Sequence, residues 1–249
     1  MKLEGKTCLV TGGSHGIGAA TAVALAAAGA DVAIVARHED AAVSRVREEI
    51  EKAGRRSCFV QADLQIAPEA KRAVEETRKA LGDPDVLVHA AGGPALGNVL
   101  EVSEAIWHAA FDLHIHAAFY LCRAVMPAMQ RKQEGAIILI SSVAGLRGCP
   151  NALAYGVVKG ALPQFARSLA RDFAASNIRV NCVAPGIIRT RFQDHLTAEQ
   201  VRNNLENRIP LRREGTPAQV ADVILTLVRN DFITGETFTI DGGMTMRIV

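Results

Sequence analysis

Short apolar runs alternate with longer helical stretches along the whole chain. Seven apolar runs have the length and the turn-rich flanks of buried strands, at 7–11, 31–36, 57–61, 86–90, 136–140, 178–183 and 237–240. Several are apolar at nearly every position, which is typical of parallel strands covered on both faces. Gly29 and Gly54 follow the first two helical stretches, as glycine often does at a helix C-terminus. We therefore expect an α/β fold, a single-domain Rossmann-type doubly wound parallel sheet of about seven strands with helices on both faces.

The segment after the first predicted strand is rich in glycine. Gly12, Gly13, Gly16 and Gly18 lie between the apolar run 7–11 and an alanine-rich helix expected over 19–28. Glycines in this position let the backbone approach a pyrophosphate, whose charge is met by N–H groups and by the positive end of the helix. No Gly-Lys-Ser/Thr sequence follows, so a nucleoside-triphosphate loop is not favoured.

Tyr155 and Lys159 are the candidate acid/base pair. They are four residues apart, so on a helix both side chains project from one face. A positive charge about 4 Å away would lower the tyrosine pKa from about 10 by about three units. Tyr155 would then serve as general acid for a ketone and general base for an alcohol, with Ser142 donating a hydrogen bond to the same oxygen. Alone, such a pair is more often a surface packing pair; its place after the glycine loop favours chemistry.

Taken in order, the motifs resemble those of the short-chain dehydrogenase/reductase family over nearly the whole chain. The matching stretches are 11–18, Asp63-Leu64, Ala90-Ala91-Gly92, Ser142, Tyr155 with Lys159, Pro185-Gly186 with Thr190, and 240–243. The resemblance implies hydride transfer between a nicotinamide cofactor and a carbonyl or secondary alcohol, with Ser142, Tyr155 and Lys159 catalytic. It implies cofactor contacts by Gly12, Ser14, His15, Gly16, Ile17, Gly18, Arg37, His38, Asp63, Leu64, Ala90, Ala91, Gly92, Tyr155, Lys159, Pro185, Gly186, Ile188 and Thr190.

Two histidines depart from the family pattern. His114 stands where relatives carry an asparagine that helps to hold a water linking the lysine to solvent, and His89-Ala90 replaces an Asn-Asn pair. Imidazole both donates and accepts hydrogen bonds, so we include His114 as a fourth catalytic residue that carries the proton relay. The simpler interpretation of His114 is a space-filling residue at a helix bend, and of His89 a strand-end residue satisfied by the backbone.

The end of the second predicted strand bears on the choice of cofactor. An acidic residue there would bind a free adenosine ribose, whereas arginine would pair with a 2′-phosphate. This chain has Ala36-Arg37-His38, and His15 occupies a place where NADP-binding relatives often carry a basic residue. With no acid to compete for the ribose, NADP(H) is favoured over NAD(H).

The segment 187–215 is less regular, and the resemblance implies a mobile substrate lid there; an ordinary surface excursion is the alternative. The expected pocket walls are Pro94, Ala95, Leu96, Val143, Ala144, Cys149 and Ile187, with Arg147, Arg189 and Arg191 nearby. These largely apolar walls suit a 3-oxoacyl thioester or a hydrophobic ketone. The chain resembles 3-oxoacyl-(acyl-carrier-protein) reductases; Arg171 matches one of their carrier-docking residues, Gln133 replaces another, and Arg131 and Lys132 are adjacent.

Composition limits the other possibilities. The 249 residues carry a net charge of +2, so neither nucleic acid nor a membrane is an expected partner. No signal-peptide pattern precedes the first strand and no apolar run reaches the roughly 18 residues that span a bilayer, which makes the cytoplasm the expected compartment. The five cysteines show no Cys-x-x-Cys spacing, and His114 and His116, two apart, point to nearly opposite sides of a helix. No metal is expected.

Three functions therefore remain open. An NADP(H)-dependent oxidoreductase is favoured by the intact Ser142, Tyr155 and Lys159. The alternatives are an NAD-linked dehydrogenase of a sugar, polyol or steroid alcohol, and a nucleotide-binding protein with little activity. The helices expected over 104–131 and 155–175 carry more apolar residues than one buried stripe needs. We therefore expect a homodimer or homotetramer assembled through them, as the family commonly has.

Overall fold

Seven parallel strands form one sheet in the order β3-β2-β1-β4-β5-β6-β7. The computed structural model describes residues 1–194 and 196–246. The strands are β1 (Thr7–Thr11), β2 (Asp31–Ala36), β3 (Ser57–Gln61), β4 (Val86–His89), β5 (Gly135–Ile140), β6 (Ile178–Pro185) and β7 (Thr237–Ile240). Strands β2 and β3 lie on one side of β1, and β4 to β7 lie on the other. Folds of this kind bind their ligands at this change of direction, between β1 and β4. The predicted doubly wound α/β fold is confirmed.

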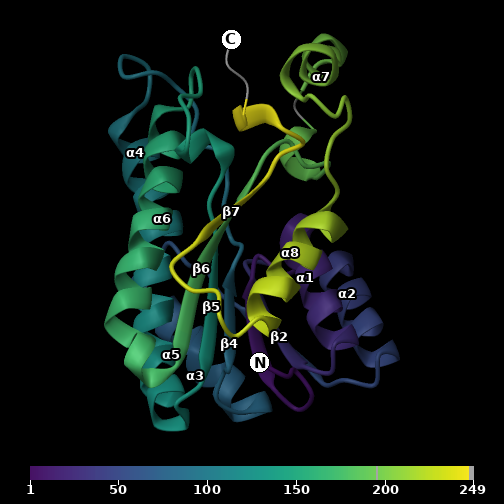
Figure 1. Ribbon diagram of the computed structural model, residues 1–249, viewed down its shortest axis with the longest axis vertical. Helices are drawn as coiled ribbons and strands as arrows, with labels where there is room; N and C mark the ends of the chain where they lie inside the picture. The colour runs from purple at the N-terminus through teal and green to yellow at the C-terminus, as the bar shows by residue number, and fades with distance from the viewer. Residues whose placement is uncertain (195, 247–249) are drawn as a thin grey trace.

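Helices cover both faces of the sheet (Figure 1). The helices α1 (Gly16–Ala27), α2 (Ala41–Lys52) and α8 (Pro217–Arg229) lie on one face, and α3 (Ala67–Leu81), α4 (Glu104–Phe111), α5 (Ala117–Lys132) and α6 (Leu153–Phe173) lie on the other. Neighbouring residues of β1 enter opposite cores, since Leu9 packs beneath α3 and α5 while Cys8 and Val10 pack beneath α1. Burial on both faces explains why these strands are apolar without alternation. None of the described helices is long and apolar enough to span a membrane.

The predicted helix over 104–131 has a discontinuity that the sequence did not reveal. A π-helical turn, Asp112–His116, separates α4 from α5. Such single turns are often found at functional sites. The other bounds differ from prediction by a few residues: β4 ends at His89, and β6 continues to Pro185.

The segment 187–215 leaves the sheet and returns to the same point. Ile188 and Gly215 form a parallel bridge at its base, where the Gly215 N–H donates to the Ile187 carbonyl at 3.0 Å. Between these ends lie a 3-10 turn (Arg191–Gln193), α7 (Ala198–Asn203) and a second π turn (Asn204–Arg208). Figure 1 shows α7 standing beyond the carboxyl ends of the strands. The bounds suit the predicted lid, whose mobility remains a prediction.

Candidate active site

A cleft of ≈ 1130 Å³ lies at the carboxyl ends of the strands. Its wall is built from the loops that follow β1 to β6 and from the segment 187–208. Every residue predicted as a cofactor contact lines it: Gly12, Ser14, His15, Gly16, Ile17, Gly18, Arg37, His38, Asp63, Leu64, Ala90, Ala91, Gly92, Tyr155, Lys159, Pro185, Gly186, Ile188 and Thr190. Ser142 and His114 line the same cleft. Tertiary structure thus gathers segments that span most of the chain into one site.

The glycine loop packs so closely that side chains are excluded. A Cβ on Gly12 would lie 2.8 Å from the backbone of Ala91, and one on Gly18 would lie 2.2 Å from the carbonyl oxygen of Gly12. Helix α1 begins at Gly16, and no side chain caps its first N–H groups. These donors and the positive helix end face the cleft, so the loop fits the pyrophosphate of a dinucleotide.

Thr11 and His89 tie this loop to the neighbouring strand. The Thr11 hydroxyl lies 2.9 Å from Nδ1 of His89, and the Ala91 N–H donates to the same oxygen at 3.2 Å. His89 is fully buried, and burial followed by the charge of Lys159 lowers its pKa to about 4. The neutral imidazole therefore fastens the ends of β1 and β4 together. The Thr11 side chain is one partner, and backbone groups of Leu113 and His114 also interact with the ring, as the sequence suggested.

The three predicted catalytic residues converge from two elements. Ser142 follows β5 and caps a 3-10 turn, accepting a hydrogen bond from the Ala144 N–H at 3.2 Å. Tyr155 and Lys159 lie one turn apart near the start of α6. The Ser141 hydroxyl donates to the Lys159 carbonyl at 2.7 Å and so joins α6 to the end of β5. Sequence reasoning missed Ser141, although strand alternation places it opposite Ser142.

The expected lowering of the Tyr155 pKa by Lys159 is wrong, because burial outweighs it. Burial raises the pKa of Tyr155 above its usual 10, and its hydrogen bond with Ser142 opposes this only partly. The Lys159 ammonium donates to the carbonyl of Ile140 at 2.7 Å, and its nitrogen is 5.7 Å from the centre of the tyrosine ring. Burial also lowers the pKa of Lys159 from 10.5 to about 8. The i,i+4 spacing places the two stems on one face, but the ammonium points to the end of β5.

His114 lies within the π turn and faces Lys159. Its ring meets that of Tyr155 edge-on, with centroids 6.0 Å apart. Nε2 is 3.2 Å from the Gly93 carbonyl, while the buried Nδ1 has no hydrogen-bond partner among the described residues. A Cβ on Gly92 would lie 3.3 Å from this Nδ1 and 3.6 Å from the nitrogen of Lys159, so both atoms surround one point. Burial, then the charge of Lys159, holds the pKa of His114 well below 6.5.

Arg37, His38 and His15 line the end of the cleft where the adenosine is expected. Arg37 is exposed and forms no ion pair or hydrogen bond with the described part of the chain. The expectation that no acid stands here needs correction, because Asp40 also lines the cleft. One oxygen of Asp40 accepts from the Ala42 and Val43 N–H groups at the start of α2, and the other lies 3.8 Å from His15. The carboxylate is therefore already engaged as a helix cap.

Most of the predicted substrate walls are in place, with three exceptions. Pro94, Val143, Ala144, Cys149, Ile187, Arg147 and Arg191 line the cleft. Ala95 does not, because it is buried against Ala154 and Val158. Leu96 is exposed, and Arg189 pairs with Glu214 at 3.0 Å outside the cleft.

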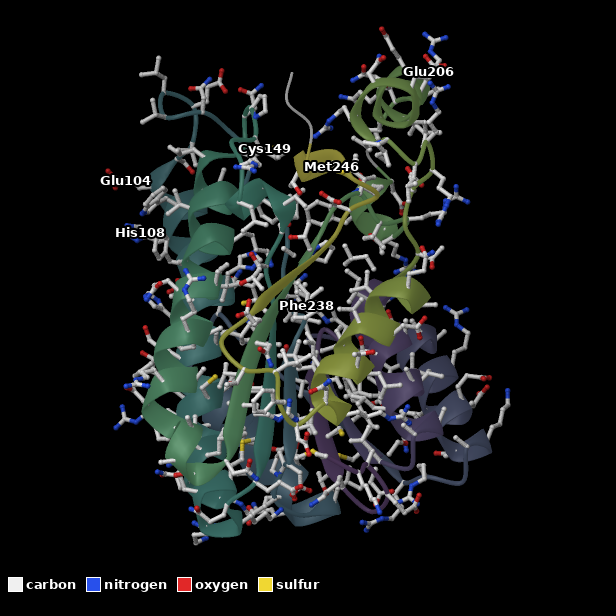
Figure 2. The ribbon with its side chains drawn as sticks, viewed as in Figure 1. Glu104, His108, Cys149, Glu206, Phe238 and Met246 are labelled. Carbon is white, nitrogen blue, oxygen red and sulfur yellow. The ribbon has the colours of Figure 1, made fainter. Side chains whose placement is uncertain are left out.

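The structure adds walls from the lid and the C-terminal segment that no sequence signal marked: Phe192, Asn204, Asn207, Arg208, Met244 and Thr245. Phe192 packs against Tyr155, with ring centroids 5.8 Å apart. Figure 2 places Cys149 and Met246 at the same end of the molecule, and an Arg147 side-chain donor reaches the Thr245 carbonyl at 3.5 Å. The substrate end of the cleft therefore lies between the loop after β5, the lid and the C-terminal segment.

Comparison with known proteins gives a family match over nearly the whole chain. A family model described as enoyl-(acyl carrier protein) reductase matches residues 12–245. A 3-oxoacyl-[acyl-carrier-protein] reductase of Synechocystis sp. is 36% identical over 247 residues, which cover 98% of each chain. A blue fluorescent protein from a metagenomic library, solved with NADPH, has a TM-score of 0.89 and 32% identity, covering 98% of this chain and 99% of that one.

L-sorbose reductase from Gluconobacter frateurii, solved with NADPH and L-sorbose, is also similar. Its TM-score is 0.92 at 29% identity, with complete coverage of both chains. The family match covers nearly the entire chain and includes the glycine loop, Ser142, Tyr155 and Lys159. The protein is a member of the short-chain dehydrogenase/reductase family.

Proposed function

We propose that the protein is an NADP(H)-dependent oxidoreductase that reduces the carbonyl of a small-molecule substrate to a secondary alcohol. The observation that carries the proposal is the meeting of Ser142, Tyr155 and Lys159 with a dinucleotide cradle in one cleft. A protein that only bound nucleotide would not need these groups beside the cradle.

The chemistry follows from the protonation states. Because the pKa of Tyr155 is raised, its phenol is protonated at neutral pH and suited to donate a proton to the oxygen of a reduced carbonyl. Ser142 stabilises the charge that develops on the same oxygen. Lys159 supplies positive charge beside them. Nδ1 of His114, which has no hydrogen-bond partner among the described residues, supports a water-mediated path for the proton of Lys159. This arrangement favours carbonyl reduction over alcohol oxidation near neutrality.

The cofactor assignment rests on charge at the adenosine end. Arg37, His38 and His15 would hold a 2′-phosphate, and the loop from Gly12 to Gly18 would hold the pyrophosphate. The bound cofactor supplies the hydride. Two relatives were solved with NADPH, which supports NADP(H) here. The carboxylate of Asp40 would favour an NAD-linked dehydrogenase, but it is already engaged at the start of α2.

The apolar walls favour a hydrophobic ketone or a 3-oxoacyl thioester as substrate. For an acyl carrier protein, the docking contribution expected from Lys132 is reduced, because its ammonium pairs with the buried Asp85 at 2.7 Å. Arg131 lies 3.5 Å from Asp83, which leaves Arg171 as the exposed matching cation. We therefore propose a substrate that has a carbonyl and an apolar part, without specifying a carrier protein. We also propose a cytoplasmic, homodimeric or homotetrameric enzyme.

The experiment is the substitution Tyr155→Phe, with Tyr120→Phe as its matched control. Tyr120 is the other tyrosine of the chain and lies on α5 away from the cleft. Loss of the proton donor should reduce the turnover of NADPH with a carbonyl substrate by about two to four orders of magnitude, while NADPH binding persists. The control should keep its turnover. Near-normal turnover of Tyr155→Phe would overturn the assignment.

A further inference from the structure

The two ends of the cleft differ in charge. The described residues that line it include two carboxylates, Asp40 and Asp63, which follow β2 and β3 at the adenosine end. At the substrate end, Arg147 projects from the loop after β5 and Arg208 from the lid. No described carboxylate lines that end. A neutral, hydrophobic substrate would leave this positive charge without a counterpart.

Arg208 is held in place by a buried amide. Its guanidinium donates to Oδ1 of Asn204 at 2.8 Å, and Asn204 is only 4% exposed. This hydrogen bond uses one of the five N–H donors of the arginine. The remaining donors have no ion-pair partner among the described residues, in contrast to Arg189 of the same segment, which pairs with Glu214.

Arg147 comes from a different part of the wall, the loop after β5. Its one hydrogen bond to a described residue is the long contact with the Thr245 carbonyl at 3.5 Å. Asp241 lies behind Thr245, but its oxygens accept from the Gly243 and Thr245 N–H groups and from the Thr245 hydroxyl. The nearby carboxylate is thus already engaged in a local turn. Both guanidiniums keep donors for a ligand.

We propose that the substrate carries an anionic group, a carboxylate or a phosphate, which Arg147 and Arg208 bind while the carbonyl meets Ser142 and Tyr155. Guanidinium groups recognise both anions through paired N–H donors, which makes them suited to fix the orientation of such a substrate. The proposal rests on the proposed function and adds a recognition element to it. A free oxo acid would supply a carboxylate, and an acyl phosphopantetheine thioester would supply a phosphate.

Matched substrates separate these sources. Acetoacetate is compared with its uncharged ethyl ester, and the acetoacetyl thioester of phosphopantetheine with that of pantetheine, which lacks the phosphate. The wild-type enzyme should show a KM at least about tenfold lower for the charged member of one pair, since hydrogen bonds between charged partners are the stronger ones. The pair with the larger ratio identifies the anion. Equal KM values within both pairs would overturn the proposal.

Arg147→Gln and Arg208→Gln should each raise KM for the charged member far more than KM for the uncharged member, and so remove most of this ratio. Arg202→Gln is the control, because Arg202 is an exposed arginine of α7 that does not line the cleft. A uniform rise of KM for both members would assign the arginines a structural role and overturn the proposal. Turnover of the uncharged members by all variants would still leave the oxidoreductase function intact.

A binding measurement keeps the test independent of turnover. In the Tyr155→Phe variant loaded with NADPH, the change in cofactor fluorescence reports the Kd of each compound. A lower Kd for the charged member of a pair supports the anion site if adding Arg147→Gln or Arg208→Gln removes the difference. This holds even if the wild-type protein shows no turnover. Equal Kd values for charged and uncharged members would refute the anion site by itself.

Discussion

Carbonyl reduction should be lost as the pH rises through about 8. Burial lowers the pKa of Lys159 from 10.5 to about 8, and the described acceptor of its ammonium is a single carbonyl, that of Ile140. The difference between the two pKa values corresponds to about 3 kcal/mol against the charged form. Lys159 is therefore protonated below pH 8 and neutral above it. If its charge is needed, kcat/KM should fall about tenfold for each further pH unit.

Tyr155, His89 and His114 do not titrate in this window. The pKa of Tyr155 is raised above 10, so the phenol stays protonated. The pKa of His89 is about 4 and that of His114 is well below 6.5, so both imidazoles are neutral above pH 7. None of these three groups therefore accounts for a fall between pH 7.5 and 9.5, and the variant Lys159→Arg tests its assignment to the lysine.

The assay is kcat/KM for reduction of a ketone that does not ionise, followed by NADPH oxidation from about pH 6 to pH 10. Lys159→Arg is the control, because a guanidinium keeps its charge across this range. Whatever its absolute rate, this variant should lack the step near pH 8. A flat wild-type profile to pH 9.5, or the same step in the arginine variant, would refute the reasoning.

Three further predictions concern the cofactor, the relay and assembly. Arg37→Asp should weaken NADPH binding by about tenfold or more and leave NADH binding similar or better, since a charge-assisted hydrogen bond is lost and a repulsion gained; equal losses for both cofactors in titration calorimetry would make Arg37 structural. His114→Asn should keep turnover, because an amide can hold the same water, while His114→Ala should lose about tenfold or more. Alanine matching wild type at every pH would exclude His114 from catalysis. Light scattering at micromolar concentration should give a dimer or tetramer, because Phe119 on α5 and Val157 on α6 are large apolar residues that remain more than 40% exposed; a monomeric mass would contradict this.

Local pattern was sufficient for most of the fold. The predicted strands match the observed ones to within two residues, because strands buried on both faces must be apolar throughout. Glycine positions in the first loop were equally informative, since only glycine fits where backbones approach to 2.8 Å. The π turn at Asp112–His116 was not predictable, because it leaves no distinct residue pattern, and its His114 lies against the loop after β4 and against α6 only in the folded chain.

The candidate site divides in the same way. Sequence alone indicated which cofactor residues meet, since parallel strands bring the loops after their carboxyl ends to one edge, and all the predicted cofactor residues line one cleft. Three predicted substrate walls, Ala95, Leu96 and Arg189, lie outside it. The charge states were decided only by the tertiary structure. The i,i+4 spacing placed Lys159 and Tyr155 on the same helix face, but the Lys159 ammonium donates its hydrogen bond to the Ile140 carbonyl. Burial shifts the pKa of each residue against its charged form. Desolvation depends on every atom packed around a group, and those atoms come from segments distant in the chain.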